Sequence, residues 1–207
     1  LRSTIADVEF PTNKDGLEDP ALVCTDDFEV DSNGHPHPNV TGWPTINGQP
    51  ITNGGPCEMA VSYSDQLIPI CEGTYKLIRT WTVLGWCPTT EIANDIQIIK
   101  VMDNVGPTLV CPANMVISTG QTDCTASVIL PLPTISDVCS PSTSYTKSAS
   151  QGLLVGNTLY GLPLGVTTVT YVATDGCGNH STCSFQILVQ DQVPPVAICE
   201  TFHVVGL

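Results

Sequence analysis

Short runs of apolar and β-branched residues alternate with polar residues along most of the chain. Clear examples are residues 80–85, 95–103, 124–132, 167–175 and 183–191. Alternation with a period of two places apolar side chains on one face of a strand, and clusters of Gly, Pro, Asn and Asp separate the runs. No stretch has the 3.6-residue period of a long amphipathic helix. The pattern therefore predicts an all-β fold.

A repeat of just under ninety residues organises these predicted strands. Three matching hexapeptides end at Cys24, Cys111 and Cys199, and each has a proline four residues before its cysteine. About seven short strands per repeat fit an immunoglobulin-like sandwich of two antiparallel sheets. The sequence therefore predicts two tandem immunoglobulin-like β-sandwiches with an orphan strand at each chain end.

The repeat also sets the expected domain boundaries. Residues 20–103 are predicted to form the first domain and residues 104–192 the second. Residues 1–19 align with the final strand and linker of a preceding unit, and residues 193–207 with the first strand of a following unit. Two explanations remain open for these orphan strands. The chain is an excerpt of a longer array, or its terminal strands complete neighbouring copies by β-strand addition.

Charge and cysteine content narrow the class of protein. The net charge is −14 with only six Lys and Arg, so we expect no nucleic-acid partner. No apolar stretch is suited to a transmembrane helix of about 20 residues, so we expect no membrane insertion. Ten cysteines without the paired CxxC spacing of zinc sites favour disulfides, and hence an extracellular or cell-surface location.

Three motifs of the second repeat carry a family resemblance. They are PTLVCP at 107–112, LPLGVTTVTYVATDGCGN at 162–179 and CSF at 183–185. On these motifs the repeat resembles the hyalin-repeat (HYR) domain, and the chain resembles tandem repeats of large bacterial extracellular surface proteins. The first repeat is more distant, because Pro88 and Thr89 replace the GN turn and Asp95 replaces the cysteine. The resemblance implies an immunoglobulin-like fold and an extracellular adhesive or architectural module, not an enzyme.

Eight cysteines are expected to form bridges. Alignment of the repeats predicts the pairs Cys57–Cys87 and Cys139–Cys177. The resemblance to the HYR domain implies the pair Cys111–Cys183, and elimination leaves Cys24 with Cys71. The two remaining cysteines, Cys124 and Cys199, pair with each other or with a neighbouring unit or chain, and this choice stays open.

No catalytic residue is predicted, because the motifs of metalloproteases, hydrolases and nucleotide-binding enzymes are absent. His35 and His37 are expected in an exposed turn and not in a metal site. No cofactor is expected, although Ca²⁺ at the unit junctions is an alternative, because Asp103 and Asp191 recur there. Trp81 is expected in the core.

The leading hypothesis is a non-enzymatic structural module of an extracellular fibre, stalk or adhesin, whose partners are copies of itself or further units of the same array. Tyr171 aligns with Trp81 in the repeat and is also expected in the core. Linker prolines are expected to limit bending between units. These prolines are Pro20, Pro107, Pro194 and Pro195. The alternative is a binding module for a carbohydrate or protein ligand, with Trp43 or Trp86 as a platform for surface glycans.

Overall fold

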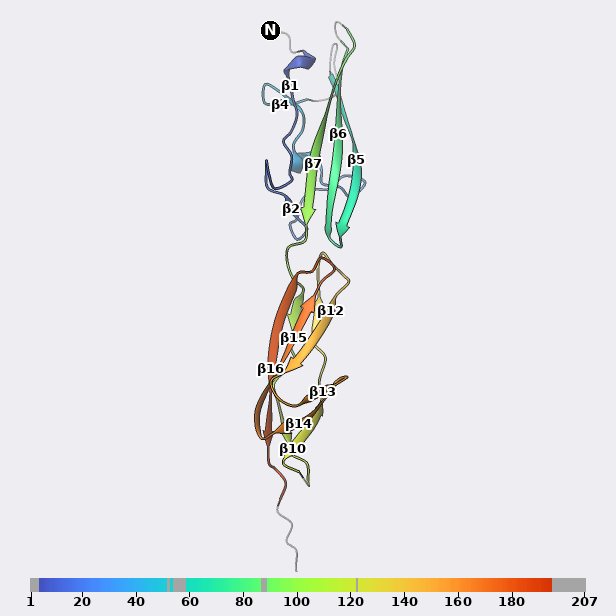
Figure 1. Ribbon diagram of the computed structural model, residues 1–207. Coiled ribbons are helices and arrows are strands. Elements are labelled where there is room, and N and C mark those ends of the chain that lie inside the picture. The colour runs from blue at the N-terminus through green and yellow to red at the C-terminus, as the bar shows by residue number, and fades with distance from the viewer. Residues whose placement is uncertain (1–3, 52, 54–58, 87–88, 122, 195–207) are drawn as a thin grey trace, which may run out of the picture. The chain divides into compact units, whose positions relative to one another are not determined.

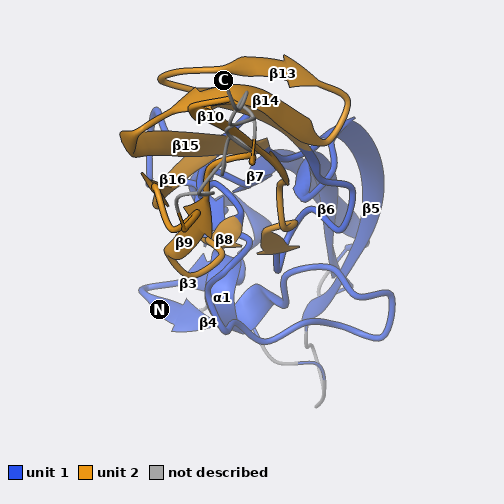
Figure 2. Cartoon of the chain, turned by 90° about the horizontal axis from the view of Figure 1, so that it is seen from below, with its two compact units in different colours: residues 1–107, 136–144, 174–180 blue, residues 108–135, 145–173, 181–207 orange. Residues whose placement is uncertain are grey.

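The computed structural model describes residues 4–51, 53, 59–86, 89–121 and 123–194. The chain divides into two compact units, coloured blue and orange in Figure 2. Unit 1 comprises residues 1–107 together with two loops, 136–144 and 174–180. Unit 2 comprises residues 108–135, 145–173 and 181–207. The sequence repeat placed both loops in the second domain, but they pack as part of unit 1.

Unit 1 is built from two antiparallel hairpin systems and two short helical turns. Its strands are β1 (Val8–Glu9), β2 (Leu22–Val23), β3 (Thr45–Ile46), β4 (Gln49–Pro50), β5 (Met59–Cys71), β6 (Thr74–Gly85) and β7 (Glu91–Met102), and its helical turns are η1 (Ile5–Asp7) and α1 (Pro38–Thr41). The main sheet has the order β2-β7-β6-β5 and the smaller sheet the order β1-β3-β4. The long strands β5, β6 and β7, which lie side by side in Figure 1, form two antiparallel pairs, β5–β6 and β6–β7. Strand β2 pairs with β7 in parallel.

Strand β6 shows how the sequence pattern produces the core of unit 1. Its inward positions Leu77, Arg79, Trp81 and Val83 are buried, while the intervening residues are wholly or partly accessible. Trp81 and Val83 pack in one cluster with Val61 of β5. Since every second side chain of a strand points to the same face, the alternation seen in the sequence becomes one buried row.

Residues 4–19 are part of unit 1, which corrects the expectation that they complete a preceding unit. Strand β1 pairs with β3, and the backbone of Lys14 bonds to Ile98 and Lys100 on β7. Val8 and Phe10 pack against the Trp81 cluster. The apolar residues of this segment thus find their partners within the same unit.

Unit 2 contains three sheets. Its strands, some of which extend into the loops of unit 1, are β8 (Thr108–Val110), β9 (Met115–Ser118), β10 (Thr125–Ile129), β11 (Thr134–Ser136), β12 (Ser144–Ala149), β13 (Leu153–Val155), β14 (Thr158–Pro163), β15 (Gly165–Thr174) and β16 (His180–Gln190). The sheets have the orders β12-β15-β16-β9, β10-β14-β13 and β11-β8. Strands β9 and β16 pair in parallel. Since both units consist mainly of strands, the predicted all-β fold class is confirmed.

The core of unit 2 joins its two larger sheets. Leu159 and Leu162 of β14 pack in one cluster with Tyr171 of β15 and with Phe185 and Ile187 of β16. Tyr171 is fully buried, and its hydroxyl donates a 2.7 Å hydrogen bond to the carbonyl of Pro131. This bond satisfies the one polar atom of the side chain, so the ring can be buried without leaving an unpaired donor. Of the orphan segment 193–207, residues 195–207 lie outside the described residues.

Candidate functional site

Three disulfides connect six of the seven described cysteines. Two of them, Cys24–Cys139 and Cys71–Cys177, lie within unit 1 and join its main part to the loops 136–144 and 174–180. The third, Cys111–Cys183, lies within unit 2. The bridges enclose sequence separations of 115, 106 and 72 residues. These long, overlapping closures are the main chemical feature of the chain.

The bridge pattern corrects two of the expected pairs. Cys139 and Cys177 do not bond to each other, because each reaches a cysteine of the first repeat at a Cα separation of 6.0 and 5.2 Å. For the same reason Cys24 and Cys71 are not partners. Both distances fall in the range that an unstrained disulfide requires. Repeat alignment pairs equivalent columns, and it carries no information about bonds that run from one repeat to the other.

The other cysteines complete this comparison. The structure contains the Cys111–Cys183 bridge that the HYR resemblance implied. Cys124 is exposed and has no bridge to any cysteine in the described part of the chain. The expected pair of Cys57 and Cys87 lies outside the described residues, as does Cys199.

The two loops of unit 1 share one local design, an aspartate two residues before the bridging cysteine. Asp137 Oδ1 accepts backbone hydrogen bonds from Cys139 and Ser140, both at 2.8 Å. Asp175 Oδ1 accepts corresponding bonds, also at 2.8 Å, from the backbone of Cys177 and from that of the residue two positions later. Such turns constrain the backbone at the bridging cysteine. The repeated Asp-x-Cys pattern is a sequence signal that the repeat analysis did not use.

The β5–β6 turn receives the first of these loops. Gly73 has a φ of 82°, and a Cβ atom at this position would lie 2.8 Å from both the Cβ and the carbonyl oxygen of Cys139. Only glycine therefore permits both the backbone conformation and the close approach. Beside it, Glu72 accepts hydrogen bonds from Ser140 through its carbonyl and from Ser142 through its carboxylate.

A third aspartate, Asp103, follows β7 and faces the two loops. It is buried with 6% of its surface exposed, and its backbone N–H donates to Thr74 Oγ1 at 2.7 Å. The Asn179 side chain donates to the carbonyl of Asp103 and to Asp175 Oδ2. Burial raises the pKa of the Asp175 carboxyl, but the hydrogen bonds from Asn179 and from the Cys177 backbone outweigh burial and hold this pKa below its ordinary value.

Unit 1 also buries an ion pair that the sequence analysis missed. The Arg79 guanidinium is fully buried, and its Nε and Nη2 donate to the two carboxylate oxygens of Asp65 at 2.8 and 2.7 Å. It also donates to the Thr41 hydroxyl and the carbonyl of Pro36, and it lies over the rings of Tyr63 and Trp81. The sequence did contain a signal for this ion pair, because Arg79 stands at an inward-facing position in the alternating pattern of β6.

The two histidines of the predicted exposed turn have separate roles. His35 Nδ1 lies 3.1 Å from Asp65, so its ring joins the ion pair of Arg79. His37 is the N-cap of α1, where Nδ1 accepts the backbone N–H of Asn39. Arg79 and His35 together contact both oxygens of the Asp65 carboxylate, so this group works as a structural network in unit 1.

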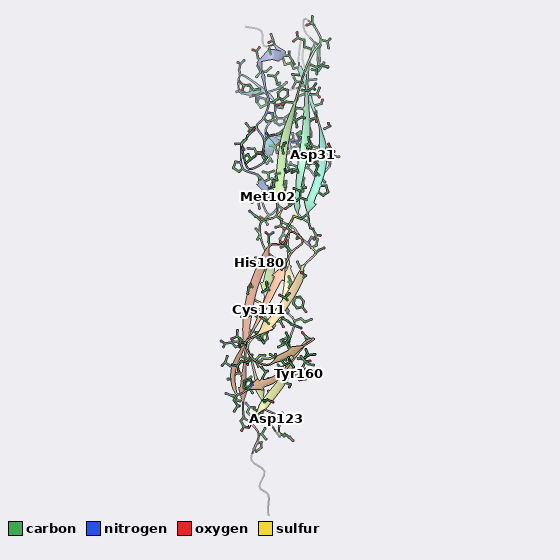
Figure 3. The ribbon with its side chains drawn as sticks, viewed as in Figure 1. Asp31, Met102, Cys111, Asp123, Tyr160 and His180 are labelled. Atoms are coloured by element: carbon green, nitrogen blue, oxygen red, sulfur yellow. A yellow bond between two sulfur atoms is a disulfide. The ribbon has the colours of Figure 1, made fainter. Side chains whose placement is uncertain are left out.

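Asp31 lies beside this network and is held ionised by its neighbours. Burial raises the pKa of the Asp31 carboxyl, but backbone hydrogen bonds from His35 and Asn33 and the hydroxyl of Tyr63 outweigh burial, so the pKa lies below its ordinary value. Figure 3 labels Asp31 in unit 1.

The remaining expected residues are placed as follows. Trp81 is fully buried, as is Tyr171 in unit 2. Asp191 is exposed at the end of β16 and accepts the backbone N–H of Val193. Among the linker prolines, Pro107 is buried, Pro20 and Pro194 are exposed, and Pro195 lies outside the described residues.

Trp43 and Trp86 differ in their surroundings. Trp43 packs against Tyr63 and Trp81 with ring centroids 6.4 and 5.7 Å apart, and its indole N–H donates to Asn39. Trp86 is 42% exposed.

The helices of the described residues are single turns, none of them suited in length or hydropathy to crossing a bilayer.

Comparison with known proteins finds a family model that matches the second repeat. Residues 102–189 match the family model described as HYR domain. The chain is 32% identical over 101 residues to the mouse protein "Sushi, von Willebrand factor type A, EGF and pentraxin domain-containing protein 1", covering 49% of the chain and 3% of that protein. It is 29% identical over 108 residues to hyalin of Strongylocentrotus purpuratus, covering 49% of the chain and 8% of hyalin. The chain thus spans a small part of both relatives.

Solved structures give weaker similarities. The human desmocollin-1 ectodomain has a TM-score of 0.28 at 11% identity, covering 64% of the chain and 33% of that structure. The PcdhgB3 EC1-4 structure has a TM-score of 0.30 at 11% identity, covering 87% of the chain and 50% of that structure.

These comparisons bear on two expectations from the sequence, the extracellular location and the resemblance to bacterial arrays. Both sequence relatives are animal proteins, so they give no support to the resemblance to bacterial arrays. The HYR match and these relatives indicate that the chain is extracellular or at the cell surface, as expected from its cysteines. Residues 102–189, which are nearly all of the second repeat, match the HYR domain model, in agreement with the resemblance seen in the sequence motifs.

Proposed function

We propose that the chain is a non-enzymatic structural module of an extracellular fibre, stalk or adhesin, in which overlapping disulfides limit how far the chain extends under tension. The observation that carries this proposal is the bridge pattern. Cys24–Cys139 and Cys71–Cys177 overlap in sequence, and Cys111–Cys183 overlaps both. A pulling force applied outside Cys24 and Cys183 is therefore carried along the shortest covalent route through the disulfides. The rest of the backbone between these two cysteines cannot be fully extended.

The covalent route through the disulfides sets an upper limit on the extension of the chain. The shortest covalent route from Cys24 to Cys183 crosses to Cys139, follows about 28 residues back to Cys111 and crosses again. Fully extended, 28 residues span about 100 Å, whereas the 159 residues from Cys24 to Cys183 span about 560 Å. The bridges thus withhold roughly four fifths of the length that unfolding would otherwise release.

Single-molecule force spectroscopy tests this role. The full chain is held by handles outside Cys24 and Cys183 and stretched with and without reductant. The oxidised chain is expected to release at most about 100 Å between these cysteines, and the reduced chain several hundred ångströms more. Cys124→Ser serves as the matched control, because Cys124 has no bridge to a described cysteine. An oxidised chain that extends as far as the reduced chain contradicts the proposal.

Assembly with copies of itself or with further units is part of the same proposal. Its support is the sequence at 194–199, which repeats the hexapeptides that end at Cys24 and Cys111. Removal of residues 193–207 is expected to shift the full chain from filaments to single molecules in electron micrographs. Filaments of unchanged length would count against assembly through this segment.

A ligand-binding module is the second candidate, favoured by a cavity in unit 1. The cavity has a volume of about 460 Å³, and Trp43 lines it together with polar residues that include Lys14 and Asn39. Aromatic rings beside polar groups suit a surface glycan as ligand. Trp43→Ala is expected to abolish binding on a glycan array, and Trp86→Ala to leave it intact. An array without any bound glycan would remove this candidate.

A further inference from the structure

Three aspartates converge in unit 1 where the two disulfide-bonded loops meet the end of β7. They are Asp103, Asp137 and Asp175, and one carboxylate oxygen of each lies within 4.8 Å of the others. Met102 and His180, labelled in Figure 3, mark this place in the chain, because Met102 directly precedes Asp103 and His180 is the last residue of the second loop. No Lys, Arg or His of the described residues forms an ion pair with any of the three.

Asp103 is the unusual member of the cluster. Its side chain is more than nine-tenths buried, and its Oδ2 has no hydrogen-bond partner among the described residues. Its Oδ1 receives only a 3.3 Å bond from the backbone of Val105. An unpaired buried carboxylate oxygen beside two further carboxylates is electrostatically unfavourable unless a cation balances the charge.

The other two aspartates each use one carboxylate oxygen mainly for a turn. Asp137 uses Oδ1 for its turn, and no hydrogen bond occupies its Oδ2 within the described part of the chain. Asp175 also uses Oδ1 for its turn, and its Oδ2 accepts one bond from Asn179. The turns therefore fix the direction of each carboxylate while its second oxygen can serve as a ligand.

Carboxylate oxygens this close together can surround a calcium ion. Three atoms that lie no more than 4.8 Å apart have a common point within about 2.8 Å of each, close to the 2.3–2.6 Å of Ca²⁺–oxygen bonds. Mg²⁺ requires about 2.0–2.1 Å and a stricter octahedron. Asp103 also lies within 4.8 Å of the sulfurs of the Cys24–Cys139 bridge, but disulfide sulfur lacks the thiolate charge that makes cysteine a metal ligand.

We infer that Asp103, Asp137 and Asp175 bind one Ca²⁺ ion, with water supplying the remaining oxygen ligands. The ion neutralises the buried Asp103 carboxylate and holds the loops 136–144 and 174–180 against the end of β7. This inference is independent of the proposed mechanical function. It includes Asp103, which the repeat suggested for a calcium junction, and it does not include Asp191, which lies in no such cluster of the described residues.

Isothermal titration of the full oxidised chain with CaCl₂, after treatment with EDTA, tests the inference. We expect one ion per chain with a dissociation constant of roughly 10⁻⁴–10⁻³ M, the range of extracellular modules. MgCl₂ is expected to bind at least tenfold more weakly. Asp137→Asn keeps the Oδ1 acceptor of the turn and removes the ligand charge, so it should weaken Ca²⁺ binding at least tenfold. Asp191→Asn is the matched control and should bind as the wild type does.

Thermal unfolding supplies a second, independent readout. The melting temperature of the wild type should rise by about 3 °C or more between EDTA and 10 mM CaCl₂. Asp103→Asn removes the unpaired buried charge, so it should melt no lower than the wild type in EDTA and show no response to Ca²⁺. The inference is overturned if no saturable binding occurs up to 10 mM, or if Asp137→Asn binds as tightly as the wild type.

Discussion

Replacing Arg79 with methionine tests whether the buried ion pair determines the stability of unit 1. Methionine fills most of the space of the arginine stem but has no donor for Asp65. The Asp65 side chain is only 3% exposed, so the carboxylate would lose both guanidinium bonds without gaining water. The hydroxyl of Thr41 and the carbonyl of Pro36 would lose their donors as well.

The expected loss of stability is large. Removing one partner of a buried pair costs about 3–5 kcal/mol, because the other charge remains buried and uncompensated. A domain of this kind has a total stability of about 5–15 kcal/mol, so the change would consume a third or more of it in most cases. Asp65→Asn combined with Arg79→Met should be less destabilising than the sum of the two single changes, since the double variant leaves no unpaired charge.

Urea unfolding followed by tryptophan fluorescence measures this loss in unit 1 alone. All three tryptophans of the chain, at 43, 81 and 86, lie in residues 1–107. Lys76→Met is the matched control, because Lys76 is an exposed cation on the same strand. An Arg79→Met variant within about 1 kcal/mol of the wild type, with an unchanged denaturant slope, would refute the reasoning.

Three further changes have defined outcomes. Gly73→Ala should cost about 2 kcal/mol or more in the same urea assay, because it adds a backbone clash to left-handed strain, whereas Gly34→Ala, with a φ of 79° and open space, should cost only about 1 kcal/mol. Since the pKa of Asp31 is lowered in the folded state, its contribution is present above about pH 4 and lost as the pH falls further, so Asp31→Asn should lower stability at pH 7 and match the wild type near pH 2; an equal deficit at both pH values would contradict this. Tyr171→Phe should cost about 1–2 kcal/mol by calorimetry, because the carbonyl of Pro131 loses its donor, and an unchanged transition would show that water replaces it.

The fold class was predictable because alternation acts locally. The inward row of β6 and the burial of Tyr171 follow from side-chain period alone, and the HYR motifs were specific enough to place the second repeat in its family. The burial of Arg79 was missed, because the alternation of apolar and polar residues predicts an apolar side chain at each inward position. Only the tertiary structure supplies the carboxylate of Asp65 that permits a buried cation.

The disulfide pattern was beyond the reach of repeat alignment. Equivalent columns suggested that Cys139 and Cys177 close one sandwich, whereas each bonds to the first repeat. The decisive feature is a contact between a turn and a loop, which depends on Gly73 lacking a side chain. The aspartate cluster was partly visible, because Asp103 stood out by its repeat position. Its two partners share the Asp-x-Cys pattern, but their convergence requires the folded loops.

The overlap of the three bridges also bears on how the chain survives outside a cell. A protease that cuts the backbone once anywhere between Cys24 and Cys183 cuts inside at least one closed ring, so both pieces stay joined by sulfur. Such a nicked molecule would keep its mass in a non-reducing gel and separate into two bands after reduction. Damage by a single cleavage is therefore contained, and loss of material requires a second cut or a reductant.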